Sequence, residues 1–147
     1  MAAIVVLIST LSACSNSSDS SPPAAPSSPT GSSLTGTWRG TASDSSGPGQ
    51  MTWQITQSGA SVSGTLTMTD TATNVTGRGS VMGTVSGSSV TFTMSVPAGG
   101  FDAPHGACTA QVSGEAQLAS STLTGSYSGS SSCAGTIASG QLTLDKQ

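Results

Sequence analysis

The chain has 147 residues and a mass of 14.2 kDa, which corresponds to one domain of ordinary size. Only 6% of the residues are charged, and three Lys or Arg against six Asp or Glu give a net charge of −3, which excludes a basic surface for a nucleic acid. One His, three Cys and six carboxylates also leave few ways to build a reactive site. We therefore expect no catalytic residues, no enzyme activity, no cofactor and no metal.

The first fourteen residues have the pattern of an export signal. Residues 2–13 form an apolar stretch that ends in small residues and is shorter than the about 20 residues that span a bilayer. Residues 11–14, Leu-Ser-Ala-Cys, resemble the lipobox of bacterial lipoproteins. The resemblance implies that residues 1–13 are a signal peptide and that Cys14 becomes an acylated N-terminus. The usual positive charges before the apolar stretch are missing, and we expect them upstream.

The lipobox resemblance also implies a location. Acyl chains on Cys14 would hold the protein on a membrane of the bacterial cell envelope. Ser15 follows the cysteine, whereas an Asp at that position retains lipoproteins at the inner membrane of enteric bacteria. We therefore expect the outer membrane, on its periplasmic or its surface face, with the membrane itself as one partner.

Residues 14–33 have the composition of a tether. Residues 15–33 are rich in Ser and Pro and contain no large apolar side chain, so they cannot bury enough surface to fold. Four prolines favour extended conformations, which predicts a disordered but partly stiff spacer. The alternative for the leader, a buried strand ending in a free thiol, is disfavoured because these polar residues could not cover it.

The cysteine count points to a disulfide. If Cys14 is acylated, Cys108 and Cys133 remain to pair in an oxidising compartment. Closing that loop of about 25 residues stabilises a fold by about 3.5 kcal/mol in the chain-entropy model. We expect Cys108 to open the sixth strand and Cys133 to open the eighth. Two strand spacings of about 9.6 Å exceed the roughly 7 Å limit between bridged Cα atoms, so at least one cysteine must lie in a loop.

Residues 34–147 have the alternating pattern of β-strands. In residues 34–41, apolar residues or Gly alternate with polar ones, which is typical of a half-buried strand. The alternation returns in further segments: 53–55, 62–68, 81–85, 90–96, 110–118, 123–129 and 137–144. Within the last segment the phase changes across Ser139 and Gly140, which predicts a bulge or an extra turn. The sequence thus predicts about eight short strands and no helix.

Such strands suit an antiparallel sandwich or an up-and-down barrel. We favour a small antiparallel up-and-down β-barrel of about eight strands, because closure removes the edges that a Thr-rich sheet would expose. Several glycines fall in phase with the apolar face: Gly36, Gly64, Gly83, Gly114 and Gly125. They either allow the strands to bend sharply or leave room for a ligand inside.

Gly36-Thr37-Trp38 resembles the Gly-x-Trp of the first strand in lipocalin-type and avidin-type barrels. The resemblance implies that Trp38 closes one end of the barrel. The match is incomplete, since Gly40 stands where avidins carry a biotin-binding Asn, and no Arg follows Arg78 to pack across the tryptophan as in lipocalins. It therefore concerns the type of strand and does not extend to biotin binding.

We expect a non-catalytic barrel that binds an envelope partner or a small apolar ligand. The candidate ligand contacts are the large aromatic side chains Trp38, Trp53, Phe92 and Tyr127. The alternative is a periplasmic inhibitor of hydrolases that acts through the long 97–107 loop. His105 in that loop is interpreted as a solvated side chain, because no second His is present to complete a metal site.

Overall fold

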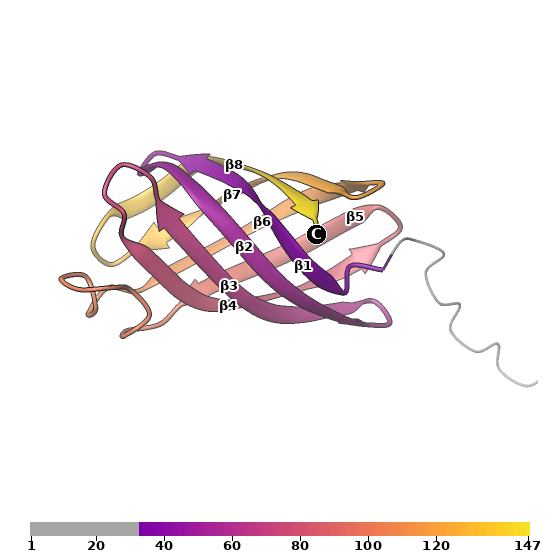
Figure 1. The fold of residues 1–147 in the computed structure, drawn as a ribbon, viewed down its shortest axis with the longest axis horizontal. Coiled ribbons are helices and arrows are strands. Elements are labelled where there is room, and N and C mark those ends of the chain that lie inside the picture. Colours follow the sequence, from indigo (N-terminus) through magenta and orange to yellow (C-terminus); the bar gives the residue numbers. More distant parts are fainter. Residues whose placement is uncertain (1–32) are drawn as a thin grey trace, which may run out of the picture.

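A computed structural model describes residues 33–147, which form one closed barrel of eight antiparallel strands (Figure 1). The strands are β1 (Gly36–Asp44), β2 (Gly47–Ser58), β3 (Ser61–Asp70), β4 (Thr76–Ser86), β5 (Ser89–Val96), β6 (Ala110–Ala119), β7 (Thr122–Ser131) and β8 (Gly135–Lys146). Each strand pairs with its neighbours in sequence, and β1 closes the barrel on β8. The predicted all-β up-and-down barrel is confirmed. The predicted signal peptide, Cys14 and all but the last residue of the tether lie outside the described residues.

The alternating pattern decides which side chains face the interior. In β1, Trp38 and Ala42 are buried, whereas Arg39 and Thr41 between them are exposed. The same alternation runs through the other strands, so one apolar core fills the barrel and the outer wall consists mainly of Ser, Thr and Gln. Burial of this apolar face is the main force that holds the strands together.

Inward-facing glycines allow the strands to approach one another closely. A Cβ atom at Gly40 would overlap the carbonyl oxygen of Thr143 on β8, and one at Gly64 would overlap the carbonyl oxygen of Gln54 on β2. The space beside these glycines is therefore occupied by the backbone of the next strand and not by a ligand. Of the two interpretations, sharp bending of the strands is the one that the structure supports.

The predicted irregularity in the last strand is a β-bulge. The register between β7 and β8 shifts between Tyr127 and Gly129, opposite the segment in which Ser139 has a φ of 55°. Gly140 pairs with Tyr127, and a Cβ there would lie 2.5 Å from the tyrosine ring. The bulge and the glycine together make room for the ring of Tyr127 on the inside of the wall.

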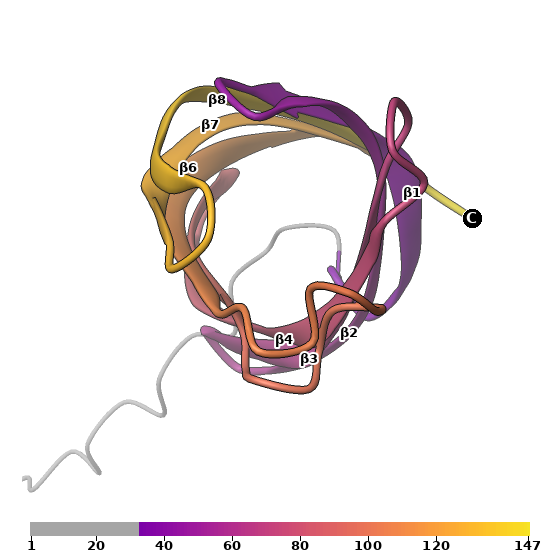
Figure 2. The same ribbon diagram turned by 90° about the vertical axis from the view of Figure 1, so that its left-hand side faces the viewer.

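The two ends of the barrel differ in their connections, and Figure 2 looks along the barrel axis onto one of them. One end, which we call the turn end, carries the tight turns 59–60, 87–88 and 120–121 together with residue 33 and the C-terminus. The other, the loop end, carries the connections 45–46, 71–75, 97–109 and 132–134. In Figure 1 the loop end lies on the left. The long connections are therefore all gathered at one end.

The turn end is plugged by apolar side chains. Leu34 and Trp38 are completely buried there, and the indole N–H of Trp38 donates to the carbonyl oxygen of Leu34 at 2.8 Å. The ammonium group of Lys146 lies 5.7 Å from the centre of the Trp38 ring, a cation–π contact. Lys146 thus helps to cover Trp38 at this end of the barrel.

We expect Gly64→Ala to destabilise the barrel by about 3 kcal/mol, because the added Cβ collides with the backbone of β2. Gly106→Ala is the matched control: its nearest neighbour would be 3.7 Å away, so the change should be within about 0.5 kcal/mol. Urea unfolding followed by tryptophan fluorescence measures both. Equal stability of the two variants would contradict the close approach of the strands.

Candidate functional site

A cavity lies at the loop end of the barrel. Its volume is about 310 Å³, and it is bounded by the ends of β1, β2, β3, β6, β7 and β8 and by the 97–109 loop. This volume falls at the lower end of the range of about 300–1,000 Å³ that is usual for small-molecule sites. Because the turn end is plugged, the loop end is where a ligand could enter.

Small and flexible apolar side chains form the floor of the cavity. Met51, Met68, Ala110 and Ile137 line it from four different strands. Below them, a smaller void of about 30 Å³ reaches Leu66 and continues the cavity into the core. Methionine adapts its shape to irregular apolar partners, so this floor suits a flexible hydrocarbon group.

Tyr127 and Asp44 form a hydrogen-bonded pair in the cavity wall. The phenol of Tyr127 donates to Oδ2 of Asp44 at 2.7 Å, and the backbone N–H of Ser46 donates to Oδ1 at 2.7 Å. Burial, and then the neighbouring carboxylate, raises the pKa of Tyr127 above its usual value. The tyrosine therefore stays protonated and acts as the donor.

Asp70 stands at the end of β3 and also lines the cavity. Its Oδ1 accepts the backbone N–H groups of Ala72 and Thr73, each at 2.8 Å, and so shapes the turn 71–75. These hydrogen bonds, with that from Thr73 foremost, hold the pKa of Asp70 below its usual value. The carboxylate is thus charged at neutral pH.

The 97–109 loop is fastened to the barrel along the edge of the cavity. Phe101 forms an isolated bridge with Gly77 of β4 and packs against the core, while the N–H of Arg78 donates to the carbonyl oxygen of Gly100 at 2.8 Å. The exposed ion pair of Arg78 with Asp102 adds a contact at 2.7 Å. Phe101 and His105 both line the cavity, which places them at its rim.

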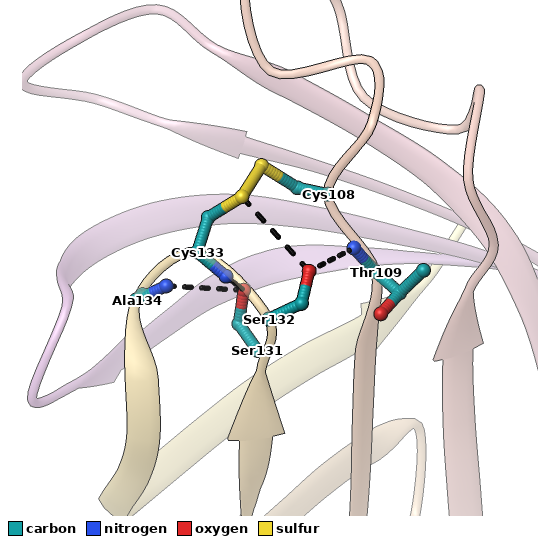
Figure 3. Close-up of a disulfide and its surroundings, with 6 residues drawn as sticks. All are labelled: Cys108, Thr109, Ser131, Ser132, Cys133 and Ala134. Atoms are coloured by element: carbon teal, nitrogen blue, oxygen red, sulfur yellow. Dashed lines mark hydrogen bonds between the residues drawn. A yellow bond between two sulfur atoms is a disulfide. The ribbon is translucent and has the colours of Figure 1, made fainter.

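The predicted disulfide joins Cys108 to Cys133 and also lines the cavity (Figure 3). Their Cα atoms lie 5.6 Å apart, although β7 stands between β6 and β8. The expectation that the cysteines open these strands is wrong, since β6 begins at Ala110 and β8 at Gly135. Both cysteines lie in loops, which confirms the geometric requirement that at least one must.

Backbone contacts hold the two sides of the disulfide together. The N–H of Thr109 donates to Oγ of Ser132 at 2.9 Å (Figure 3). The N–H of Ser132 in turn donates to the carbonyl oxygen of Thr109 at 2.9 Å. The 132–134 turn is thereby drawn across the end of β7 toward the long loop. Disulfide and hydrogen bonds together fix one side of the cavity mouth.

The four aromatic candidates from the sequence do not gather at one site. Tyr127 lines the cavity, whereas Trp38 lies at the turn end, and Trp53 and Phe92 pack edge to face within the core at a centroid distance of 5.1 Å. Within residues 33–147, the indole N–H of Trp53 has no hydrogen-bond partner. Three of the four side chains therefore fill the barrel below the cavity.

Sequence reasoning missed Asp44, Asp70 and the two floor methionines as cavity residues. A signal was present: Asp44 continues the inward phase of Trp38 and Ala42, and Asp70 continues that of Leu66 and Met68. An acidic residue at an inward-facing position at the end of a strand indicates that the rim of the barrel is polar. The turn 71–75 was also missed, because it contains neither Gly nor Pro.

Replacing Cys108 and Cys133 together by alanine should lower the free energy of unfolding by about 2–5 kcal/mol. The reason is that the loop between them is no longer constrained in the unfolded chain. Chemical denaturation measures the loss. Labelling of Cys108 and Cys133 by a thiol reagent in the unreduced, folded protein would contradict the disulfide.

Among residues 33–147, no group of three or more His, Cys, Asp or Glu could hold a metal ion. The same part of the chain contains no helix long and apolar enough to cross a membrane. Comparisons of the chain with models of protein families, with curated proteins and with solved structures found no match.

Proposed function

We propose that the protein is a lipid-anchored lipoprotein of the bacterial envelope whose barrel binds a small apolar ligand without catalysis. The observation that carries the proposal is the cavity of about 310 Å³ at the loop end, with its floor of methionine, alanine and isoleucine side chains. Transfer of apolar surface from water into such a site is the main source of affinity for small ligands. The outer membrane is the proposed location.

The chain enters the barrel at the turn end, so an anchor upstream of residue 33 would not cover the cavity at the loop end. Lys146 donates from Nζ to the carbonyl oxygen of Ser33 at 2.6 Å, which fixes the start of the described chain at the turn end. An acylated Cys14 upstream of Ser33 would therefore attach the barrel by its plugged end. The cavity would open away from the membrane, toward ligands in the surrounding compartment.

The contacts of the 97–109 loop favour ligand binding over hydrolase inhibition. An inhibitory loop needs to project into a cleft of its target, whereas this loop is bridged to β4 through Phe101 and Arg78. Phe101 turns inward to pack against the core. The loop is thus suited to act as one wall of the cavity.

Filling the cavity tests the proposal. We expect Ala110→Phe to weaken binding of a neutral apolar fluorescent probe by about tenfold or more, because the added ring occupies the floor. Ala119→Phe is the matched control, since Ala119 is exposed at the far end of the same strand. Fluorescence titration gives both affinities. Equal binding by the two variants, or no binding by the unaltered protein, would refute the proposed ligand site.

The anchor is tested separately. Cys14→Ala should move the protein from the membrane fraction to the soluble fraction, because the acyl chains that supply the membrane affinity can no longer be attached. Fractionation with immunodetection measures the distribution, and the Cys108→Ala/Cys133→Ala variant should stay with the membranes. Retention of the Cys14→Ala protein in the membrane fraction would argue against lipid anchoring.

A further inference from the structure

We infer that the cavity selects ligands that carry a cationic head, such as an alkylammonium group, on an apolar chain. This inference rests on the proposed function, since it concerns the same cavity. The cavity provides the binding site, and the charged groups at its rim decide which head group the ligand carries.

The two rim carboxylates flank the start of β2. Asp44 pairs with Gly47 and Asp70 pairs with Gly49, so only the short stretch 47–49 separates them. Because Gly47 and Gly49 have no side chains, little covers the space between the two carboxylates. A Cβ at Gly47 would lie 3.6 Å from Oδ2 of Asp70, which places this oxygen on the side toward β1 and Asp44. The two negative charges therefore act on the same part of the mouth.

The carboxylate oxygens at this mouth can accept further donors from a ligand, because each has two lone pairs. Both oxygens of Asp44 and Oδ1 of Asp70 accept hydrogen bonds from the protein, as described above. The second oxygen of Asp70, Oδ2, faces the space beside Gly47, and the side chain of Thr73 also donates to this carboxylate. An ammonium group brings up to three donors and a positive charge to such an oxygen.

Basic side chains do not offset these charges. Arg39 faces outward on β1 beside Asp145 of β8, Arg78 pairs with Asp102, and Lys146 lies over Trp38 at the turn end. These three are all the Lys and Arg of the chain, and none lines the cavity. His105 at the rim is the remaining basic group. A negatively charged head group would therefore be repelled by the negative charges at the mouth.

The remaining surfaces suit the same ligand. Tyr127 and Phe101 line the cavity with the carboxylates, and aromatic rings attract cations. The methionine floor accepts the hydrocarbon chain below the head group. A neutral alcohol of equal length could use the floor and donate one hydrogen bond to a carboxylate, but it brings no positive charge and fewer donors than an ammonium group.

The experiment compares octylammonium, octanol and octanoate, which share one chain and differ in charge. Isothermal titration of the full-length protein gives the three affinities. We expect octylammonium to bind about tenfold or more tightly than octanol, and octanoate more weakly than octanol. Raising the salt concentration should weaken octylammonium binding and leave octanol binding unchanged.

The Asp44→Asn/Asp70→Asn variant should reduce the preference for octylammonium over octanol to within about threefold. Asparagine keeps one acceptor oxygen, which can serve the Ser46 N–H at position 44 and the 71–75 turn at position 70, while the amide N–H at position 44 can donate to the Tyr127 hydroxyl. Circular dichroism checks that the barrel is intact. The matched control is Asp102→Asn/Asp145→Asn, which removes the same net charge from residues outside the cavity lining. This control should keep the full preference.

The outcomes separate this inference from the proposed function. If octanol and octylammonium bind the unaltered protein equally, or if the control variant loses the preference as strongly as the cavity variant, the selection for cations is refuted while an apolar ligand site stands. If none of the three ligands binds, the proposed function fails as well. His105→Gln removes the basic rim group, and weaker octylammonium binding by this variant would also overturn the inference.

Discussion

Closure of the eight strands gives the barrel an interior of nearly constant width, and the rest of the molecule depends on how side-chain volume fills it. The chain has few aromatic residues, and most of the large ones are used in the lower part of the core, where Trp38, Trp53 and Phe92 are almost completely buried. Toward the loop end, the inward positions carry Ala42, Ala110 and several glycines. The cavity is thus the consequence of an uneven distribution of volume along one core.

An unfilled end would weaken a barrel of this size unless something else held the strand ends in place. Here the connections at the loop end supply that support: the long loop is bridged to β4 through Phe101, and the disulfide crosses the end of β7. Both lie at the rim, so they constrain the mouth without occupying the interior. The cavity can then persist in the absence of a ligand, which reduces the entropy that binding must overcome.

Much of this fold could be predicted from the sequence because a barrel strand has a period of two. The phase of Trp38 and Ala42 identifies the inward face of β1, and the break in phase at Ser139 identifies the bulge. The disulfide was predictable because three cysteines with one assigned to acylation leave one pair. These inferences use only residues that are close in sequence. They suffice for most of the fold because each strand of an up-and-down barrel pairs with the strands next to it in the chain.

The site was less predictable because it depends on how the strand ends meet in three dimensions. The aromatic residues were expected to mark a ligand site, yet Trp53 and Phe92 serve as core. Whether an inward side chain fills the barrel or lines a cavity depends on its height along the axis and on the sizes of its neighbours on other strands. Asp44 and Asp70 lie on one rim only because both strands end at the same height, and single-strand patterns do not specify this.

The rim carboxylates connect the loops to the chemistry of the cavity. An inward acidic side chain costs folding free energy unless it is hydrogen-bonded, and both are: Asp44 by Tyr127 and Ser46, and Asp70 by the backbone of the 71–75 turn. The Asp70 hydrogen bonds use one carboxylate oxygen to order the turn and leave the negative charge at the mouth. Stabilisation of the loop end and the electrostatic character of the cavity therefore come from the same side chains.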